Sequence, residues 1–189
     1  MSILAHQLPM TVEQWEPIAT PRAELLNGYE YDLRCQSTTV THANVCSNIV
    51  MALRASLRNR DLKCTASTEG PLVRINDNIA HIPDAWIECE RDAGLPDTHI
   101  APCTVVEVLS DSTRPYDNTT KLSSYMQLVG FITDYLIVDP ANRSAVRHHK
   151  MANNDVFTTQ YSGDMSIDLQ AGNHKVCIRM ADVFEGLID

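Results

Sequence analysis

The stretch Thr104-Val105-Val106-Glu107-Val108-Leu109-Ser110 decides the fold. β-Branched and aliphatic residues fill it almost without interruption, as in a central strand that is covered on both faces. Glu107 is the exception. An ionised carboxylate in such a buried position costs on the order of several kcal/mol unless a cation or hydrogen-bond donors compensate it. The stretch therefore predicts a central strand and a compensating partner for Glu107.

A second acid, Asp84, lies upstream in Ile82-Pro83-Asp84-Ala85-Trp86, inside a predicted strand from Ile79 to Cys89. Pro83 is tolerated there if its position needs no hydrogen-bond donor. If this strand neighbours the one that carries Glu107, the two carboxylates approach each other, and such oxygen ligands suit a hard cation such as Mg²⁺. A plain structural alternative is that Asp84 follows Pro83 in a turn and that Glu107 pairs with an arginine. We favour that alternative for Asp84 taken alone and the functional interpretation for Glu107.

The segments around these stretches predict a sheet with helices against its faces. Asn27-Gly28, between two alternating segments, is typical of a tight hairpin turn. From Thr41 to Arg60, apolar residues recur every four positions, which predicts an amphipathic helix. The other expected elements are extended chain over 64–75, a loop over 90–102, a helix from an N-cap at Asp117 through Val129 and stopped by Gly130, a strand over 135–138, further strands after Ser144 and a closing helix over 180–187. This order predicts a single α/β (α+β) domain over residues 1–189, with an N-terminal hairpin and extra C-terminal strands.

The charge of the chain limits its partners. The net charge of −9 argues against a protein that coats nucleic acid through bulk electrostatics, although it leaves room for a local basic groove. Two basic groups stand out, and solvated surface charge is the more ordinary interpretation of each. The groups are Arg54, Arg58, Arg60 and Lys63, and Arg143, Arg147, His148, His149 and Lys150.

Hydropathy and the spacing of the cysteines bear on where in the cell the protein is expected. No apolar run approaches the roughly 20 residues of a membrane helix, and the N-terminus lacks the features of a secretory signal. We therefore expect a cytoplasmic protein with no membrane partner. The six cysteines form no C-x-x-C pair, so we expect them to be reduced and mostly to be small core residues. Cys46 and Cys103 lie near histidine-containing segments, which leaves a cysteine-dependent hydrolase as a minor alternative.

Lys121 is the third candidate for chemistry. It lies near the start of the predicted helix after Glu107, where the helix dipole disfavours a lysine, and it borders the apolar stripe of that helix. Beside two metal-binding carboxylates, its ammonium could orient a water and stabilise developing charge on a phosphate. A surface lysine is an equally good interpretation on these grounds. Glu24, which alternates with apolar residues in the hairpin, and His42, at a helix start, are weaker candidates.

In order and spacing, several groups of residues resemble the Uma-two family of restriction endonucleases, which belongs to the PD-(D/E)XK nuclease superfamily. The groups are Pro83-Asp84, then Glu107-Val108-Leu109-Ser110, then Asp117 with Lys121 and Tyr125, then Tyr135-Leu136-Ile137-Val138-Asp139-Pro140. Glu24-Leu25-Leu26-Asn27-Gly28 with His42, and the closing stretch from Ala181 to Leu187, are similar to the two ends of that family. The resemblance covers roughly residues 10 to 187.

The resemblance implies a restriction-endonuclease-like central mixed sheet flanked by helices. It also implies a Mg²⁺ site, in which Mn²⁺ can substitute, formed by Asp84, Glu107 and the backbone carbonyl of Val108. One departure matters, because the lysine that the superfamily has two positions after the acid is Leu109 here. Lys121 would take over its role, and the catalytic set would then be Asp84, Glu107, Lys121 and Glu24.

Two functions are consistent with this resemblance. The first is a Mg²⁺-dependent endonuclease that hydrolyses phosphodiester bonds of DNA, working as a homodimer because cutting both strands needs two sites. The second is a catalytically inactive module that keeps the nuclease fold and binds nucleic acid or a protein partner. The acidic balance of the chain and the leucine at position 109 favour the second function.

Overall fold

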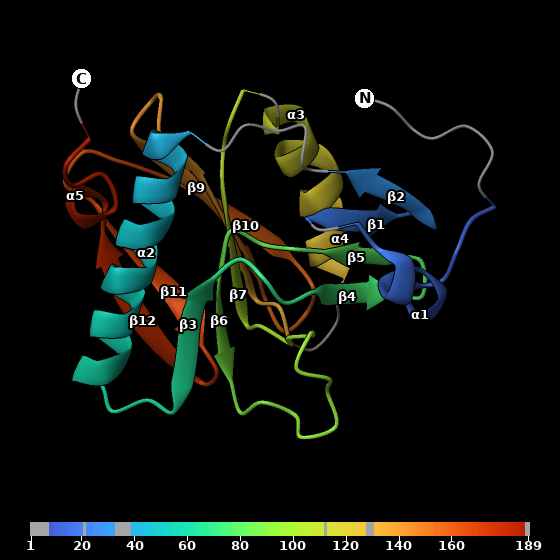
Figure 1. The fold of residues 1–189 in the computed structure, drawn as a ribbon. Coiled ribbons are helices and arrows are strands. Elements are labelled where there is room, and N and C mark those ends of the chain that lie inside the picture. Colours follow the sequence, from blue (N-terminus) through green and yellow to red (C-terminus); the bar gives the residue numbers. More distant parts are fainter. Residues whose placement is uncertain (1–7, 21, 33–38, 112, 128–130, 188–189) are drawn as a thin grey trace.

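A central six-stranded mixed sheet forms the middle of the molecule (Figure 1). The computed structural model describes residues 8–20, 22–32, 39–111, 113–127 and 131–187. The strands follow the order β10-β9-β8-β7-β6-β3. Their bounds are β3 Cys64–Thr68, β6 Ala85–Cys89, β7 Thr104–Val108, β8 Asp134–Asp139, β9 Ser144–Lys150 and β10 Val156–Ser162. The predicted central strand is therefore confirmed as β7, which pairs antiparallel with β6 and parallel with β8.

Two smaller sheets flank the central one. The four-stranded sheet β2-β1-β5-β4 lies on one side with the short helix α1, Val12–Trp15, and its 3₁₀ extension, Glu16–Ile18 (Figure 1). Its strands are β1 Ala23–Leu26, β2 Tyr29–Asp32, β4 Val73–Asn76 and β5 Ile79–His81. The two-stranded sheet consists of β11, Ser166–Ala171, and β12, His174–Arg179. The C-terminal strands expected after Ser144 are thus confirmed.

The hairpin β1–β2 forms where the sequence predicted it. Asn27 and Gly28 both have positive φ, 52° and 83°, which is the geometry of a tight turn between twisted antiparallel strands. Gly28 is also required sterically, because a Cβ added there would lie 2.7 Å from the Cβ of Pro9. This turn fixes the register that places Glu24 opposite Tyr31 and turns Glu24 toward the interior.

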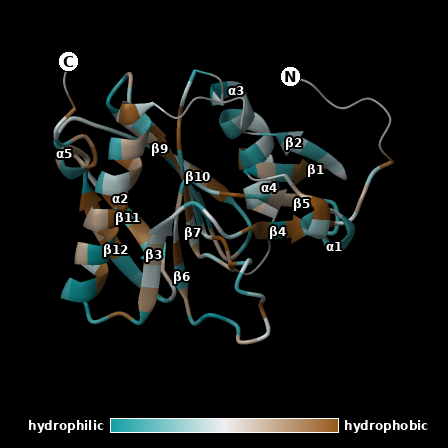
Figure 2. Ribbon diagram, viewed as in Figure 1, coloured by the Kyte–Doolittle hydropathy of each residue, from teal (hydrophilic) through white to brown (hydrophobic). Residues whose placement is uncertain are grey.

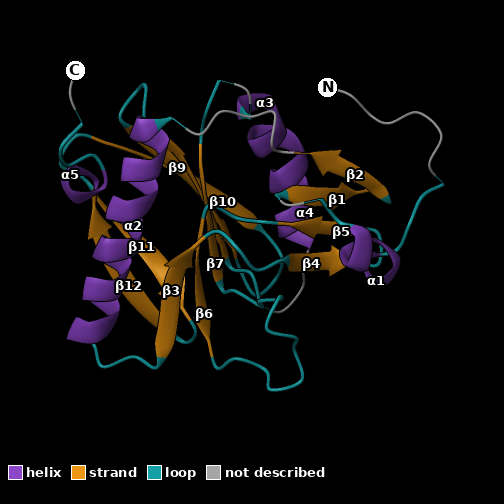
Figure 3. Cartoon of the chain, in the orientation of Figure 1, coloured by secondary structure: helices purple, strands orange, loops and turns teal. Residues whose placement is uncertain are grey.

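Helix α2, Val40–Asn59, confirms the predicted amphipathic helix. Its apolar face packs on β3 and β12 and on the closing helix α5, Met180–Val183, which is shorter than the predicted span of 180–187. Hydrophobic residues gather on the strands and on one side of the helix (Figure 2), and helices are few compared with strands (Figure 3). The buried residues of α2 are Val45, Cys46, Ile49, Val50, Leu53 and Leu57.

The single strand predicted from Ile79 to Cys89 is wrong. The chain forms β5 in the small sheet, bends over Ile82–Asp84 and continues as β6 in the central sheet. Pro83 explains the break, because it has no backbone N–H to give to a sheet ladder. The bend carries Asp84 across the junction between the two sheets.

The crossover from β7 to β8 contains an irregular helix rather than the continuous one predicted from Asp117. It begins with α3, Arg114–Tyr116, passes through a π-helical turn, Asp117–Lys121, and continues as α4, Leu122–Gln127. Asp117 is therefore inside the helix and is not its N-cap; the predicted end at Val129 and Gly130 lies outside the described residues. Two side chains explain the π turn, because Asn118 Nδ2 and Thr119 Oγ1 bond the carbonyls of Arg114 and Pro115. Those carbonyls would accept backbone N–H groups in a regular α-helix.

The cysteines also differ from expectation. Cys64 and Cys89 face each other in register on β3 and β6 and form a disulfide, so the prediction that all cysteines are reduced is wrong for this pair. Cys46, Cys103 and Cys177 are free, and Cys35 lies outside the described residues. No local motif marks this pair, because only the strand register brings the two thiols together.

Candidate functional site

Lys121 stands at the centre of a buried polar cluster between the small sheet, β7 and the crossover helix. Its Nζ lies 2.9 Å from Glu107 Oε1 and 3.0 Å from Glu24 Oε1. The same ammonium lies 3.9 Å from Asp117 Oδ1 and donates to the carbonyl of Ile82 at 3.4 Å. The lysine side chain is 5% exposed, so the interpretation as a surface lysine is wrong. The π-helical turn that ends at Lys121 directs it inward.

Glu24 is the fully compensated acid of this cluster. Tyr116 Oη donates to Glu24 Oε2 at 3.0 Å, and the backbone N–H of Ile82 donates to Oε1 at 2.9 Å. His81 Nδ1 lies 3.1 Å from Oε2. Burial alone would raise the pKa of this carboxyl, but the neighbouring Lys121 and His81 and its hydrogen bonds lower the pKa to about 2. Glu24 is therefore ionised in the folded protein.

Glu107 is buried with fewer donors. Its Oε1 accepts the hydrogen bonds of both Lys121 and Tyr125, the latter at 3.2 Å. Desolvation raises the pKa of Glu107 well above its ordinary range, and the nearby Asp84 and Asp117 raise it further. Lys121 opposes this rise but does not cancel it. A second positive charge at this carboxylate would therefore stabilise its ionised form.

Asp84 lies at the end of β6 beside Glu107. Ala85 pairs with Val106 in the antiparallel pair β6–β7. One residue further along this register, Asp84 lies opposite Glu107. Its Oδ2 accepts the backbone N–H of Val108 at 2.7 Å, and its Oδ1 lies 3.3 Å from His42 Nε2. The structure thus brings the amide of Val108 to Asp84, whereas a ligand role for the Val108 carbonyl stays a prediction.

Asp117 and three aromatic residues of the cluster were not among the predicted site residues. Asp117 is 2% exposed, and burial raises its pKa to about 6 despite the nearby Lys121. Tyr116, Tyr125 and His81 supply the contacts to Glu24 and Glu107 described above. The spacing of Asp117, Lys121 and Tyr125 at intervals of one helical turn was the available signal, because such residues share a helix face.

Leu109 lies in the apolar layer under α4 with Tyr125 and Tyr135, and it is 7% exposed. Leu109 is therefore part of the core, and the cation beside Glu107 is Lys121. Of the basic groups in the sequence, Arg54 donates to the carbonyl of Ala66 and Arg147 pairs with Asp134. These two arginines are thus committed to the fold.

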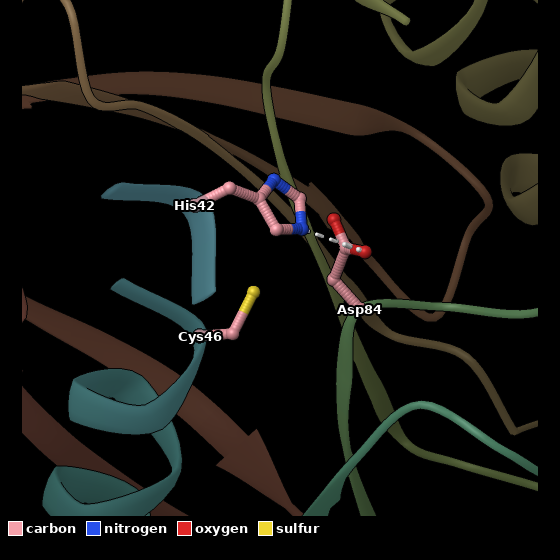
Figure 4. Close-up of side chains that lie close together, drawn as sticks. All are labelled: His42, Cys46 and Asp84. Carbon is pink, nitrogen blue, oxygen red and sulfur yellow. Dashed lines mark ion pairs between the residues drawn. The ribbon is translucent and has the colours of Figure 1, made fainter. Parts of the chain in front are cut away.

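His42 and Cys46 of α2 point toward Asp84 from the other side of the junction (Figure 4). Burial and the nearby Asp84 and Glu107 raise the pKa of the Cys46 thiol, and the pKa of the half-buried Cys103 thiol is also raised by burial. Both thiols are therefore protonated at neutral pH and are poor nucleophiles. His42 already turns Nε2 to Asp84, so the arrangement gives no support to the cysteine-dependent hydrolase.

The donor set fits a divalent cation of the hard, oxygen-binding kind. One ammonium is shared by Glu24, Glu107 and Asp117, with Asp84 nearby, so negative charge exceeds positive charge in the cluster. Within the described part of the chain, both hydrogen bonds to Glu107 end on Oε1, which leaves Oε2 for a further partner. Carboxylates at this density are the ligands that Mg²⁺ and Mn²⁺ prefer.

Comparisons with known proteins agree with this fold. A curated relative, an uncharacterised protein of the cyanobacterium Synechocystis sp., is 26% identical over 164 residues, which covers 84% of this chain and 82% of the relative. A crystal structure of "a putative nuclease belonging to DUF820" from Anabaena variabilis matches with a TM-score of 0.69 and 15% identity. That match covers 93% of this chain and 98% of the other and shows the same fold.

The family comparison covers most of the sequence. The profile of the Uma2 (Uma-two) family, described as "Putative restriction endonuclease", matches residues 10–175. The matched region contains Glu24, Asp84, Glu107 and Lys121. The chain therefore belongs to the Uma2 family.

Proposed function

We propose that this protein is a metal-dependent endodeoxyribonuclease whose active site is the cluster around Lys121. The observation that carries the proposal is the buried ammonium of Lys121 held between Glu24 and Glu107, next to Asp84 at the junction of two sheets. A solvated surface explains neither the burial nor the shared contacts. Membership of a family described as restriction endonucleases supports the same assignment.

Asp84 and Glu107 are the residues that would hold a Mg²⁺ ion, with the Val108 carbonyl as a third ligand. When bound, such an ion supplies charge neutralisation at a phosphate and makes a water more acidic. A cation at this place would favour the ionised form of Glu107, because it offsets the desolvation and repulsion that raise the pKa of this carboxyl. Mn²⁺ offers similar coordination and would substitute.

Lys121 and Glu24 act as a charged pair in this proposal. Glu24, ionised and anchored by Tyr116 and Ile82, fixes the lysine ammonium in place. A fixed ammonium can hold the attacking water or stabilise the negative charge that develops on the phosphate. Tyr125 keeps the Glu107 carboxylate oriented through its hydroxyl.

The proposed substrate is DNA. We expect binding through a local surface rather than through net charge, since the chain carries −9 overall. Cleavage of both strands needs two active sites, so we expect two copies of the chain to act together as a homodimer.

The test is cleavage of supercoiled plasmid by the purified chain with Mg²⁺, with Mn²⁺ and with a chelator. We expect cleavage only with metal, and a loss of about 100-fold or more in Asp84→Asn and Glu107→Gln. Glu88→Gln is the matched control, because Glu88 is a buried acid on β6, the strand that follows Asp84, and it accepts hydrogen bonds from Arg91 and the Ala101 amide instead.

Two results would contradict the proposal. Equal cleavage by wild type and by the two variants would assign the activity to a contaminant. Salt-sensitive DNA binding without uptake of Mn²⁺ in calorimetry would instead identify a non-catalytic binding module.

A further inference from the structure

A second group of metal-ligating side chains lies on the far side of Asp84. His42 and Cys46 are one turn apart on α2, and they face Asp84 across the junction (Figure 4). One imidazole nitrogen, the thiol sulfur and one carboxylate oxygen all lie within 4.8 Å of one another. The three atoms therefore lie in one small volume, with His42 and Asp84 already paired.

The chemistry of this trio differs from that of the Lys121 cluster. Sulfur and imidazole nitrogen are soft and borderline ligands, which select Zn²⁺ and similar transition metals over Mg²⁺. In a tetrahedral Zn²⁺ site with these donors, neighbouring ligand atoms are about 3.3 to 3.6 Å apart. His42 Nε2 and Asp84 Oδ1 are 3.3 Å apart, so this edge of the tetrahedron is already formed.

We propose that His42, Cys46 and Asp84 form a binding site for a thiophilic divalent cation of the Zn²⁺ class. Three protein ligands leave a fourth position for water or a ligand group, as in open rather than purely structural sites. The His42 and Asp84 side chains are 13% and 20% exposed, so an ion can reach the site from solvent. Cys46 closes it from the interior, with 6% exposure.

The helix makes the site preorganised. Residues four apart on an α-helix lie on one face, so His42 and Cys46 present both ligands to the same point. Thr39 caps this end of α2 through the backbone N–H of His42, which fixes the position of that turn. The Val108 amide holds the other oxygen of Asp84, so that Oδ1 faces His42.

Asp84 belongs both to this site and to the proposed Mg²⁺ site, but the remaining ligands are separate. Glu107 belongs only to the Mg²⁺ site, and Cys46 only to the thiophilic site. The shared Asp84 couples the two sites, but Glu107 and Cys46 each report on one of them alone. Variants at these three positions can distinguish a failure of one site from a failure of the other.

The experiment is titration of the full-length chain with Co²⁺, the spectroscopic substitute for Zn²⁺. We expect one Co²⁺ per chain, with a near-ultraviolet sulfur-to-cobalt charge-transfer band and the strong visible bands of a tetrahedral ion. Zn²⁺ should displace the Co²⁺ and remove the bands, whereas excess Mg²⁺ should not.

Cys46→Ser should remove the charge-transfer band and weaken Co²⁺ binding by about 100-fold or more, beyond the effect of losing an outer-shell partner. Cys177→Ser is the matched control, because Cys177 is also free and partly buried, and it should keep the band. Glu107→Gln should keep it as well, and Asp84→Asn should weaken both metal sites. Far-ultraviolet circular dichroism confirms that each variant is folded, and His42→Asn tests the site if Cys46→Ser does not fold.

Three results would overturn the proposal. The first is the absence of a thiolate band in folded wild-type protein. The second is the same band in Cys46→Ser, which would assign the sulfur to another cysteine. The third is loss of the band in Glu107→Gln, which would place the ion in the Lys121 cluster.

Discussion

Glu107 and Asp134 are buried acids on adjacent strands of one sheet, but their surroundings differ. Asp134, on β8, is 0% exposed and accepts from Arg147 through both oxygens, at 2.7 and 3.1 Å. His149 lies 2.8 Å from Oδ1, and the Gln170 amide donates to Oδ2. Glu107, on β7, is 2% exposed, and the two hydrogen bonds that it receives from described residues both end on Oε1.

This difference indicates that Asp134 stabilises the fold, whereas Glu107 is a candidate for function. Asp134 has a bidentate arginine and further donors on both oxygens, which is what a buried carboxylate needs for stability. Glu107 shares its single ammonium with Glu24 and Asp117. A fold that only had to bury Glu107 would be more stable with a full set of donors, and the shortage is what the proposed cation site requires.

The largest expected effect on stability comes from removing Asp134, the acid with donors on both oxygens. Asp134→Ala leaves Arg147 without its partner at a mostly buried position, and removal of one member of a buried pair typically costs about 3–5 kcal/mol. Urea unfolding should therefore show that the free energy of unfolding falls by that amount, while Mn²⁺ binding by the folded fraction stays unchanged. A loss below about 1 kcal/mol in the free energy of unfolding would show that the Asp134–Arg147 pair does not stabilise the fold.

A smaller effect is expected from Asp117, whose protonation makes the stability of the fold depend on pH. Its folded-state pKa of about 6 lies above the ordinary value of 3.8, so between these values the native state binds a proton that the unfolded state has lost. The contribution of Asp117 to stability is therefore fully present below about pH 4 and is lost as the pH rises through 6. Glu24 acts in the opposite direction, but only as the pH falls from 4.5 toward 2.

Asp117→Asn tests this linkage, because asparagine imitates the protonated acid. In the presence of a chelator, the variant should be about 2–3 kcal/mol more stable than wild type at pH 7, and the difference should shrink toward zero near pH 4. Thermal unfolding across this pH range provides the measurement. A constant difference at all pH values would contradict the raised pKa.

The smallest effect on stability is expected from Glu107→Gln. The amide keeps an oxygen for Lys121 and Tyr125 and removes the cost of a carboxylate with too few donors, so the free energy of unfolding should change by less than about 1 kcal/mol. Saturating Mn²⁺ should stabilise wild type, by about 2.7 kcal/mol at 100 times the Kd, but not this variant. If Glu107→Gln lowered the free energy of unfolding by several kcal/mol, Glu107 would be a residue that stabilises the fold, as Asp134 is.

The sequence predicted much of this site because one acid interrupted an apolar run. Glu107 could be found in that way, whereas the position of Lys121 fitted a surface lysine equally well, and the family resemblance selected it. Asp134 could not, because it stands at the edge of the run Tyr135–Val138 and looks like part of the preceding turn. Its partners come from β9, through the strand register, and from β11, which belongs to the separate two-stranded sheet and reaches Asp134 through tertiary packing.

The remaining differences have the same origin. The break between β5 and β6 depends on which sheet each half joins, and Pro83 alone does not reveal that. The Cys64–Cys89 disulfide and the cluster of His42, Cys46 and Asp84 both require a packed structure to be seen. No helix among the described residues is long and apolar enough to cross a membrane, which agrees with the hydropathy of the sequence.

Anomalous diffraction from crystals soaked in Mn²⁺ tests the central claim most directly. In wild-type crystals, we expect a peak within coordination distance of Asp84 and Glu107, and none at Asp134. The peak should disappear in Glu107→Gln crystals of the same form. A fully occupied soak with no density beside Glu107, or with equal density in the variant, would contradict the account.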